Sequence, residues 1–241
     1  MTLMLHAGGW SASMAELLRV PVPAATDSYM PVPYDRLIDE VKLQLPRFGL
    51  HVSREEYGLA RGGNQLFGVL SCRNGRPDQD YCLAIGLRSS YDRSLSVGLV
   101  AGSRVFCCDN LAFFGDVRSM RKHTTYVLRD LPGIVYRMLA EVAQQRSRID
   151  EEIAALKSRI VTAHEAHHLM VEAVRRGAIS SAKLPKVLRE WEAPRHQEFT
   201  LRTAWSLLNA FTEVQKTASP SRQMDGSLKL ASLFRRELSL N

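Results

Sequence analysis

Three stretches in the first half of the chain have the mix of hydrophobic and polar positions that is typical of half-buried strands. They are residues 51–60, 65–72 and 81–88. The segments 61–64 (Arg-Gly-Gly-Asn) and 74–75 (Asn-Gly) separate them with residues that accept the positive φ of tight turns. The pattern therefore predicts an antiparallel meander.

We expect the meander to end in a central pair of strand-like runs. Residues 95–100 and 105–108 continue the small and β-branched composition of strands, and residues 89–94 have the Ser and Asp content of a turn. Residues 113–123 are then expected to form a connecting segment. Residues 124–128 are expected to be a short strand or a linker.

A short amphipathic helix is predicted just before the meander. Leu37, Ile38 and Val41 follow helical spacing, and the helix is expected to begin at Tyr34 and to close near Pro46. Its hydrophobic side would cover one face of the sheet. The predicted fold class is therefore α+β.

A very long helical signal follows the sheet, with Pro132 expected in its first turn and Gly177 at its end. Hydrophobic positions recur alternately every four and three residues. The seam comprises Ile149, Ile153, Leu156, Ile160, Ala163, His167, Met170 and Val174. Such a seam must be buried, so we expect it to pack on a helix at residues 199–216 or on another copy of the chain.

The remaining chain divides around these elements. A shorter helix is predicted at 183–191, a linker at 219–226 and a last amphipathic helix at 228–238. The predicted regions are an extended N-terminal arm with one short helix around residues 13–19 (1–33), an α+β sheet domain (34–130), a long helical hairpin (131–218) and a linker with a C-terminal helix (219–241).

Composition and charge narrow the class of protein. The chain has 241 residues, of which 45% are hydrophobic and 24% charged, as in ordinary globular proteins. Its net charge of +7 favours a polyanionic partner. No run approaches the ~20 apolar residues of a membrane span. The four cysteines lack paired zinc spacing and no basic leader is present, so we expect a cytoplasmic protein.

Basic and aromatic residues gather at the end of the predicted sheet and in the segment after it. Cations that neutralise phosphates beside aromatic rings that stack on bases are what binding to single-stranded nucleic acid requires. The candidates are Arg88, Tyr91, Arg93, Arg104, Arg118, Arg121, Lys122 and His123. The alternative is that the neighbouring Phe106, Phe113 and Phe114 belong to the core and that the arginines are dispersed over the surface.

The sharpest chemical motif lies within the predicted long helix. His164, Glu165 and His168 form H-E-x-x-H, in which two imidazoles one turn apart can hold Zn²⁺ while the carboxylate activates water. A third ligand is needed, and the candidates Glu190 and Glu192 have no supporting motif. The alternative is that His167 fills the seam, while His164 and His168 flank it as half-exposed polar residues.

Other reaction classes find no support in the sequence. Cys72 and Cys82 would flank a hairpin turn, and Cys107 and Cys108 with His123 would give at most an irregular zinc site, so buried thiols are the preferred interpretation. The chain has no phosphate-binding loop and no Gly-x-Ser-x-Gly. We therefore expect neither a cofactor nor an enzymatic step.

Several segments together resemble a known family. Residues 90–94 (Ser-Tyr-Asp-Arg-Ser), 104–111 and 122–124 (Lys-His-Thr) are similar to successive signatures of a phage- and plasmid-borne family of unknown function. Residues 204–205 and 209–213 resemble its C-terminal helix, so the resemblance spans roughly residues 34–216. The order of elements is also similar to that of phage single-strand annealing proteins, which form rings on DNA.

The leading hypothesis from the sequence is an oligomeric protein that binds single-stranded DNA, with strand annealing as its extension. Two alternatives remain open. One is a zinc-dependent hydrolase built on the H-E-x-x-H motif, and the other is a non-enzymatic structural oligomer whose long helices assemble copies of the chain.

Overall fold

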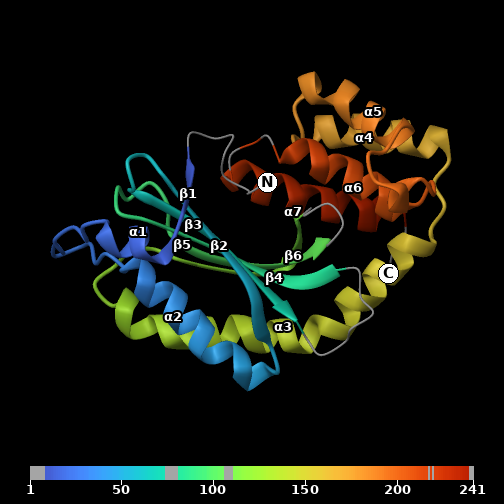
Figure 1. Cartoon of the computed structure of the whole chain (residues 1–241). Helices are drawn as coiled ribbons and strands as arrows, with labels where there is room; N and C mark the ends of the chain where they lie inside the picture. The colour runs from blue at the N-terminus through green and yellow to red at the C-terminus, as the bar shows by residue number, and fades with distance from the viewer. Residues whose placement is uncertain (1–8, 74–80, 106–110, 217, 219, 239–241) are drawn as a thin grey trace. The chain divides into compact units, whose positions relative to one another are not determined.

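The structure, a computed structural model, describes residues 9–73, 81–105, 111–216, 218 and 220–238 (Figure 1). It is an α+β protein in which an antiparallel sheet is followed by helices, as the sequence predicts. A short strand and a short helix precede the main sheet, and the helix α1 (Met14–Arg19) coincides with the one predicted in the N-terminal arm.

Six consecutive strands build the sheet. They are β1 (Trp10–Ala12), β2 (His51–Ala60), β3 (Gln65–Arg73), β4 (Tyr81–Ser90), β5 (Val97–Val105) and β6 (Leu111–Arg121). Strands that are neighbours in the chain are neighbours in the sheet. The antiparallel register pairs Gly58 with Phe67 and Leu70 with Ile85. The predicted antiparallel meander is therefore confirmed, and β1 extends it by one strand. The break expected between residues 100 and 105 is absent, because residues 97–105 form the single strand β5.

The segment 113–123, which we expected to be a connection, lies mostly in strand β6, so this prediction was wrong. A run of basic residues suggests a solvated loop, but β6 is an edge strand, and edge strands commonly carry charged side chains that discourage pairing with other chains. Arg118 and Met120 are exposed on this strand. Ser89 and Ser90, expected in a turn, are the buried end of β4, where the Ser90 hydroxyl accepts a hydrogen bond from the Leu95 backbone nitrogen at 2.9 Å.

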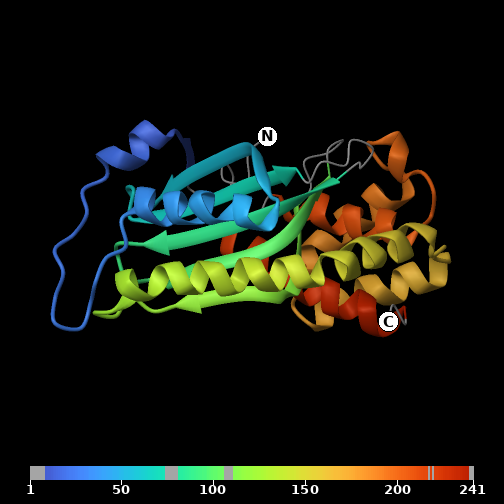
Figure 2. The same cartoon turned by 90° about the horizontal axis from the view of Figure 1, so that it is seen from below.

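Two helices cover one face of the sheet, as Figure 2 shows from below. Helix α2 (Tyr34–Gln44) is followed by the 3₁₀ turn η1 (Leu45–Phe48), which closes it near Pro46 as predicted. Helix α3 (Val127–Ser158) runs beside α2. Pro132 lies in the second turn of α3, later than predicted, and is exposed.

The core beneath these two helices is one cluster of alternate strand residues and one side of each helix. Since side chains alternate along a strand, one face of β3 and β4 points into this cluster. Its members include Leu37, Ile38 and Val41 of α2, Leu66 and Leu70 of β3, Ile85 and Leu87 of β4, and Leu131, Val135 and Leu139 of α3.

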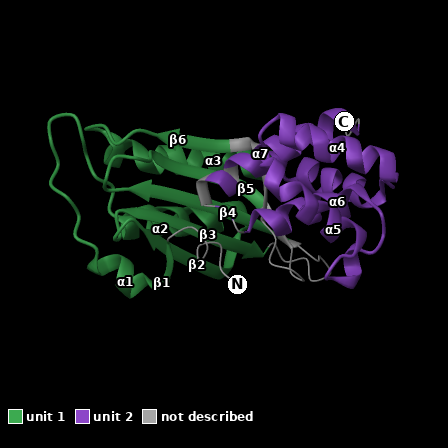
Figure 3. Ribbon diagram, turned by 90° about the horizontal axis from the view of Figure 1, so that it is seen from above, with its two compact units in different colours: residues 1–104, 116–144 green, residues 105–115, 145–241 purple. Residues whose placement is uncertain are grey.

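The chain clusters into two compact units, shown in Figure 3. Unit 1 comprises residues 1–104 and 116–144, and unit 2 comprises residues 105–115 and 145–241. The first half of α3 therefore belongs with the sheet, and its second half belongs with the later helices. These limits differ from the regions expected from the sequence, which ended the sheet domain at residue 130.

Unit 2 is helical around one buried helix. Its further elements are α4 (Ala163–Arg175), η2 (Ser181–Lys183), α5 (Leu184–Glu192), η3 (Gln197–Phe199), α6 (Ala204–Gln215) and α7 (Pro220–Glu237). Residues 204–212 of α6 are all buried, because α5 and α7 both pack on this helix. Phe211 of α6 meets Phe234 of α7 edge to face, with ring centres 6.0 Å apart. The predicted start of the last helix at residue 228 was wrong, since α7 already begins at Pro220, a favoured first residue.

The predicted continuous seam from Ile149 to Val174 is also wrong, because the helix breaks within it. Helix α3 ends at Ser158, and Thr162 caps α4 with a reciprocal pair of hydrogen bonds. Ile160 lies in the break and is 53% exposed, and His167 is exposed on α4. The strong capping sequence outweighs the hydrophobic repeat. Helix α4 buries Ala166, Leu169, Met170 and Ala173 instead.

Candidate nucleic-acid interface

One edge of the sheet in unit 1 gathers the turns between its strands. In an antiparallel sheet β5 begins where β4 ends, and β6 ends at the same edge. We call residues 88–96 and 118–126 together the strand-end edge. Most of the basic residues singled out in the sequence belong to it.

Arg93 is the most constrained cation of the strand-end edge. Its backbone is left-handed, with φ of 63°, which is uncommon for a residue other than glycine. Its guanidinium carbon lies 4.4 Å from the centre of the Tyr29 ring, in a cation–π contact. Tyr29 is buried, and its hydroxyl donates to the carbonyl oxygen of Tyr91 at 3.2 Å. Arg93 is itself exposed, so a fixed ring presents its charge to solvent.

The sequence pattern did not predict the role of Tyr29. This residue lies in a Pro-rich segment that we interpreted as an extended arm, and its contacts reach residues about sixty positions away in the chain. Local periodicity carries no signal for such a contact. In the structure, mutual backbone hydrogen bonds between Thr26 and Tyr29 close a short turn that carries the Tyr29 ring.

His123 anchors the segment that follows β6. It is 8% exposed, and its ring nitrogens lie 3.3 Å from the Met30 carbonyl oxygen and 3.4 Å from the Ser89 hydroxyl. The Met30 backbone nitrogen donates to the His123 carbonyl oxygen at 3.1 Å. Burial lowers the pKa of His123 below its usual range, although the hydrogen bond to Met30 opposes this shift. His123 therefore supports the edge as a neutral residue and adds no charge near neutral pH.

Lys122 and Arg118 are exposed cations of the strand-end edge. Neither has a carboxylate partner among the residues whose side chains the structure describes. Arg121, which lies between them, differs because it donates to Asp130 of α3 at 2.6 Å. Asp130 therefore holds the Arg121 side chain against α3, whereas Lys122 and Arg118 are exposed.

Arg88 lies flat across the neighbouring strand β5. Leu87 points into the helix-covered core, so by alternation Arg88 lies on the opposite face of the sheet. Its Nη2 is 3.9 Å from the sulfur of Met120 on β6. A Cβ atom at Gly98 would approach Cγ and Nε of Arg88 to 3.1 Å. Glycine at position 98 therefore leaves the room that this side chain occupies.

One candidate from the sequence is buried, and another lies outside the described side chains. Tyr91 is 6% exposed, and its ring stacks on Tyr34 with centres 4.0 Å apart, so it offers no free face to a base. The expectation that Tyr91 is a stacking platform was wrong, because the tyrosine packs into the core below the turn. The side chain of Arg104 lies outside the described part of the structure, as do Phe106, Phe113 and Phe114.

One carboxylate belongs to the strand-end edge. Asp92 accepts hydrogen bonds from the backbone nitrogen of Ser94 at 2.9 Å and from the Ser94 hydroxyl. Arg61, in the β2–β3 turn, lies 3.5 Å from it. Partial burial acts to raise the pKa of Asp92, but the bonds from Ser94 outweigh it and hold the pKa below its usual range. Asp92 is thus a turn-forming anion that Arg61 already balances.

The H-E-x-x-H motif lies at the start of α4. The Glu165 carboxylate accepts from the Thr162 backbone nitrogen at 2.8 Å and from the Thr162 hydroxyl at 2.9 Å, and Arg159 donates to it at 2.5 Å. These bonds lower the pKa of Glu165 to about 2. His164 and His168 are exposed, and His168 lies 3.6 Å from Glu237. The glutamate therefore completes a helix cap here.

Neither candidate for a third zinc ligand joins the motif among the described residues. Glu190 is buried and accepts from the backbone nitrogen of Arg195 at 3.1 Å. Glu192 is exposed at the end of α5. Among the described residues, no three His, Cys, Asp or Glu side chains cluster as a metal site would require.

Cys72 and Cys82 are buried free thiols. Cys72 lies opposite Leu83 in the sheet, so the two cysteines point to different faces and do not meet across the hairpin. Burial raises the pKa of Cys72 to about 12. Cys107, Cys108 and the 74–75 turn lie outside the described residues.

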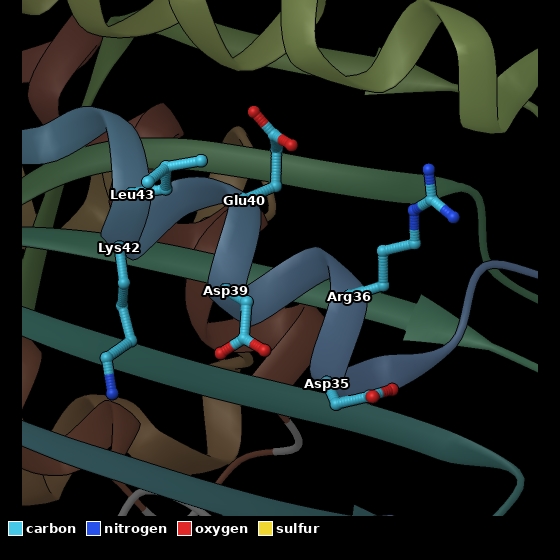
Figure 4. Close-up of a pocket in the computed structure, with 6 residues that line it drawn as sticks. All are labelled: Asp35, Arg36, Asp39, Glu40, Lys42 and Leu43. Carbon is cyan, nitrogen blue, oxygen red and sulfur yellow. The ribbon is translucent and has the colours of Figure 1, made fainter.

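A shallow depression of about 570 Å³ lies along α2, and Figure 4 shows its lining. It is lined by Asp35, Arg36, Asp39, Glu40, Lys42 and Leu43. Asp39 and Lys42 extend on one side of the helix, and Arg36 and Glu40 extend on the other. Lys42 is paired with Glu55 at 2.7 Å. Three carboxylates make this depression unsuitable for phosphates, which leaves the strand-end edge as the candidate interface.

Comparison with known proteins places the chain in a family without assigning a reaction. No described helix is long and apolar enough to span a membrane. No curated protein matches the chain, and no solved structure matches it. Residues 23–234 match the family model described as domain of unknown function DUF932. Since the match covers most of its length, the chain belongs to the DUF932 family.

Proposed function

We propose that this protein binds single-stranded nucleic acid through the strand-end edge of unit 1. The observation that carries the proposal is the preorganised cation at Arg93, held 4.4 Å above the buried Tyr29 ring in an exposed turn. A cation that is ordered before binding loses little conformational entropy when it contacts a phosphate. Lys122, next to the anchored His123, adds a second exposed charge.

The distribution of charge favours a polymer over a single phosphate. Arg118 and Lys122 are four residues apart in extended or nearly extended chain, which corresponds to about 13 Å at the rise of a strand. Cations spread over such a distance suit successive phosphates of a nucleic acid backbone. Among the described side chains, neither Arg118 nor Lys122 pairs with a carboxylate.

Fluorescence anisotropy with labelled oligo(dT) tests the proposal. We expect Arg93→Glu and Lys122→Glu each to weaken binding by about ten-fold at low salt and to reduce the slope of log K against log salt by about one. Arg189→Glu is the matched control, because it reverses an exposed arginine of α5, which belongs to unit 2 and not to the strand-end edge. Wild-type protein that fails to bind at low salt, or a control variant as weak as the others, would contradict the proposal.

Strand annealing and assembly of copies along DNA extend this proposal. They are supported by the resemblance to phage- and plasmid-borne proteins and by the +7 net charge, and such a role belongs in the cytoplasm. Sedimentation velocity with and without oligo(dT) tests the assembly of copies. Several chains per oligonucleotide are expected, and a single chain at every ratio would rule out the assembled form.

A further inference from the structure

A stripe of aromatic and basic residues lies on the outer face of α3 in unit 1. Tyr126 immediately precedes α3, and Arg129, Gly133, Tyr136 and Arg137 follow it at intervals of three or four positions on one face of the helix. All five are exposed, with 58% exposure at Tyr126 and 50% at Tyr136. Exposed tyrosines interleaved with arginines are the combination that stacks bases and contacts phosphates.

The first half of the stripe contains a cation–π contact like the one between Arg93 and Tyr29. The Arg129 guanidinium carbon lies 4.4 Å from the centre of the Tyr126 ring. Arg129 also donates to Asp130 at 3.2 Å, which holds the guanidinium in place. One face of the Tyr126 ring is therefore covered by a cation. Since Tyr126 is 58% exposed, other parts of its ring remain open to solvent.

The second half of the stripe is ordered by a glycine and a phenylalanine. A Cβ atom at Gly133 would lie 3.4 Å from Nη1 of Arg137, so this guanidinium reaches back over the glycine. The ring centre of Tyr136 is 5.4 Å from that of Phe48, with the rings tilted by 54°. Phe48 supports one side of Tyr136 while half of the tyrosine remains exposed.

The stripe continues directly from the strand-end edge. The Thr124 backbone nitrogen donates to the Lys122 carbonyl oxygen at 2.8 Å, and the Val127 nitrogen donates to the Thr124 carbonyl oxygen at 2.9 Å. The Thr125 hydroxyl donates to the Asp27 carbonyl oxygen at 2.9 Å, which ties the turn that carries Tyr29 to the same segment. Lys122 and Tyr126 therefore lie in one hydrogen-bonded segment between β6 and α3.

We infer that the outer face of α3 makes this interface selective for single strands. Tyr126 and Tyr136 stack on unpaired bases, and Arg129 and Arg137 hold the phosphates between them. The two tyrosines are ten residues apart, about 15 Å along the helix, so they engage different bases. Bases within a duplex are already stacked and paired, so they gain nothing from these rings. The inference rests on the function proposed above.

The charge of this stripe favours a nucleic acid over a second copy of the chain as its partner. A two-fold contact through this stripe would place Arg129 and Arg137 of one copy against the same arginines of the other. Like charges across an interface oppose association. The phosphates of a single strand complement them.

The test compares the affinity of the full chain for oligo(dT) and for a duplex of equal length. We expect Tyr126→Ala and Tyr136→Ala each to weaken single-strand binding by about ten-fold while duplex binding changes by less than about two-fold. The conservative Tyr126→Phe and Tyr136→Phe variants should retain wild-type affinity, because stacking uses the ring. Trp10→Ala, which removes a partly exposed ring from the distant edge strand β1, is the matched control.

The outcomes separate this inference from the proposed function. If the wild type binds oligo(dT) but the alanine variants bind as tightly, the α3 stripe is not the stacking surface although the strand-end edge still binds. Equal losses for single strand and duplex would also overturn the inference, since the rings would then not discriminate. If the wild type binds neither, the proposed function itself fails. Circular dichroism of each variant verifies that it is folded.

Discussion

The rings of Tyr34 and Tyr91 lie parallel, with centres 4.0 Å apart and planes inclined by 2°. The Tyr34 backbone nitrogen donates to the Tyr91 hydroxyl at 3.2 Å, and the Tyr34 hydroxyl donates to the Gly63 carbonyl oxygen at 3.0 Å. This pair joins the first turn of α2 to two turns of the sheet. Burial raises the pKa of Tyr91 to about 12, so both tyrosines remain neutral structural residues.

Replacement of Tyr91 should therefore affect folding more than binding. Tyr91→Ala removes a buried ring from the stack, and we expect the free energy of unfolding to fall by about 3 kcal/mol. Tyr91→Phe keeps the stack and loses one hydrogen bond, so its cost should be about 1 kcal/mol. Urea denaturation measures both. A fully stable Tyr91→Ala protein with weakened oligonucleotide binding would instead restore Tyr91 as a contact residue.

The burial of His123 should make stability depend on pH in the mildly acidic range. Because burial lowers its pKa in the folded state, the unfolded chain binds the proton more readily. The stabilising contribution is complete above about pH 6.5, the pKa in the unfolded chain, and is lost as pH falls toward the lower native value. His123→Gln should lose less stability between pH 7 and pH 5 than the wild type.

Urea denaturation at a series of pH values checks this prediction. Glu55 and Glu165 also have shifted pKa values, but both are lowered carboxylates that titrate at more acidic pH. Their contributions therefore lie outside the window chosen for His123. Equal pH dependence in the wild type and the His123→Gln variant would show that His123 is not the titrating group.

Because the helix breaks between α3 and α4, two similar substitutions should change the stability of the protein by very different amounts. Ile153 is fully buried within unit 2, so Ile153→Asp places a carboxylate in the core and should unfold the protein or lower its stability by about 4 kcal/mol. Ile160 is 53% exposed, so Ile160→Asp should change stability by about 0.5 kcal/mol or less. Thermal denaturation compares them. Loss of oligomers in the Ile160→Asp variant alone would identify that residue as an intermolecular contact.

The start of α4 should behave as a helix cap and not as a zinc site. Thr162→Ala removes the capping hydroxyl, and we expect it to cost about 1 kcal/mol. His164→Ala should have little effect on stability, since the side chain is exposed. Metal analysis of the purified protein should find no stoichiometric zinc. One zinc per chain that is lost with either His164→Ala or His168→Ala would reverse this interpretation.

Several elements followed from local sequence because their causes are local. The turn at Arg61 to Asn64 needs positive φ, and its glycines supply it. Pro33 and Pro46 bracket α2, and Gly177, with φ of 65°, follows the end of α4. Hydrophobic composition then identified the strands on either side of such turns. These features depend on neighbours in the chain, so the sequence alone determined them.

Part of the candidate site was also visible in the sequence. The cluster of Arg93, Arg118 and Lys122 near the end of the sheet could be predicted because successive antiparallel strands must turn at the same edge. The stripe on α3 was available from spacing alone, since Tyr126, Arg129 and Tyr136 recur at helical intervals. We expected residues 124–128 to form a short strand or a linker, which separated Tyr126 from the helix.

Tertiary structure decided which of these residues face solvent and which are neutralised. Tyr91 and His123 are as polar in sequence as their exposed neighbours, yet contacts with Tyr34 and Met30 bury them. Arg121 differs from Lys122 only because Asp130 reaches it. The sequence determined strands β2, β3 and β4, the turn at Arg61 to Asn64 and the approximate position of the charge. Burial and ion pairing depend on contacts between residues far apart in the chain, so only the folded structure assigned the individual roles.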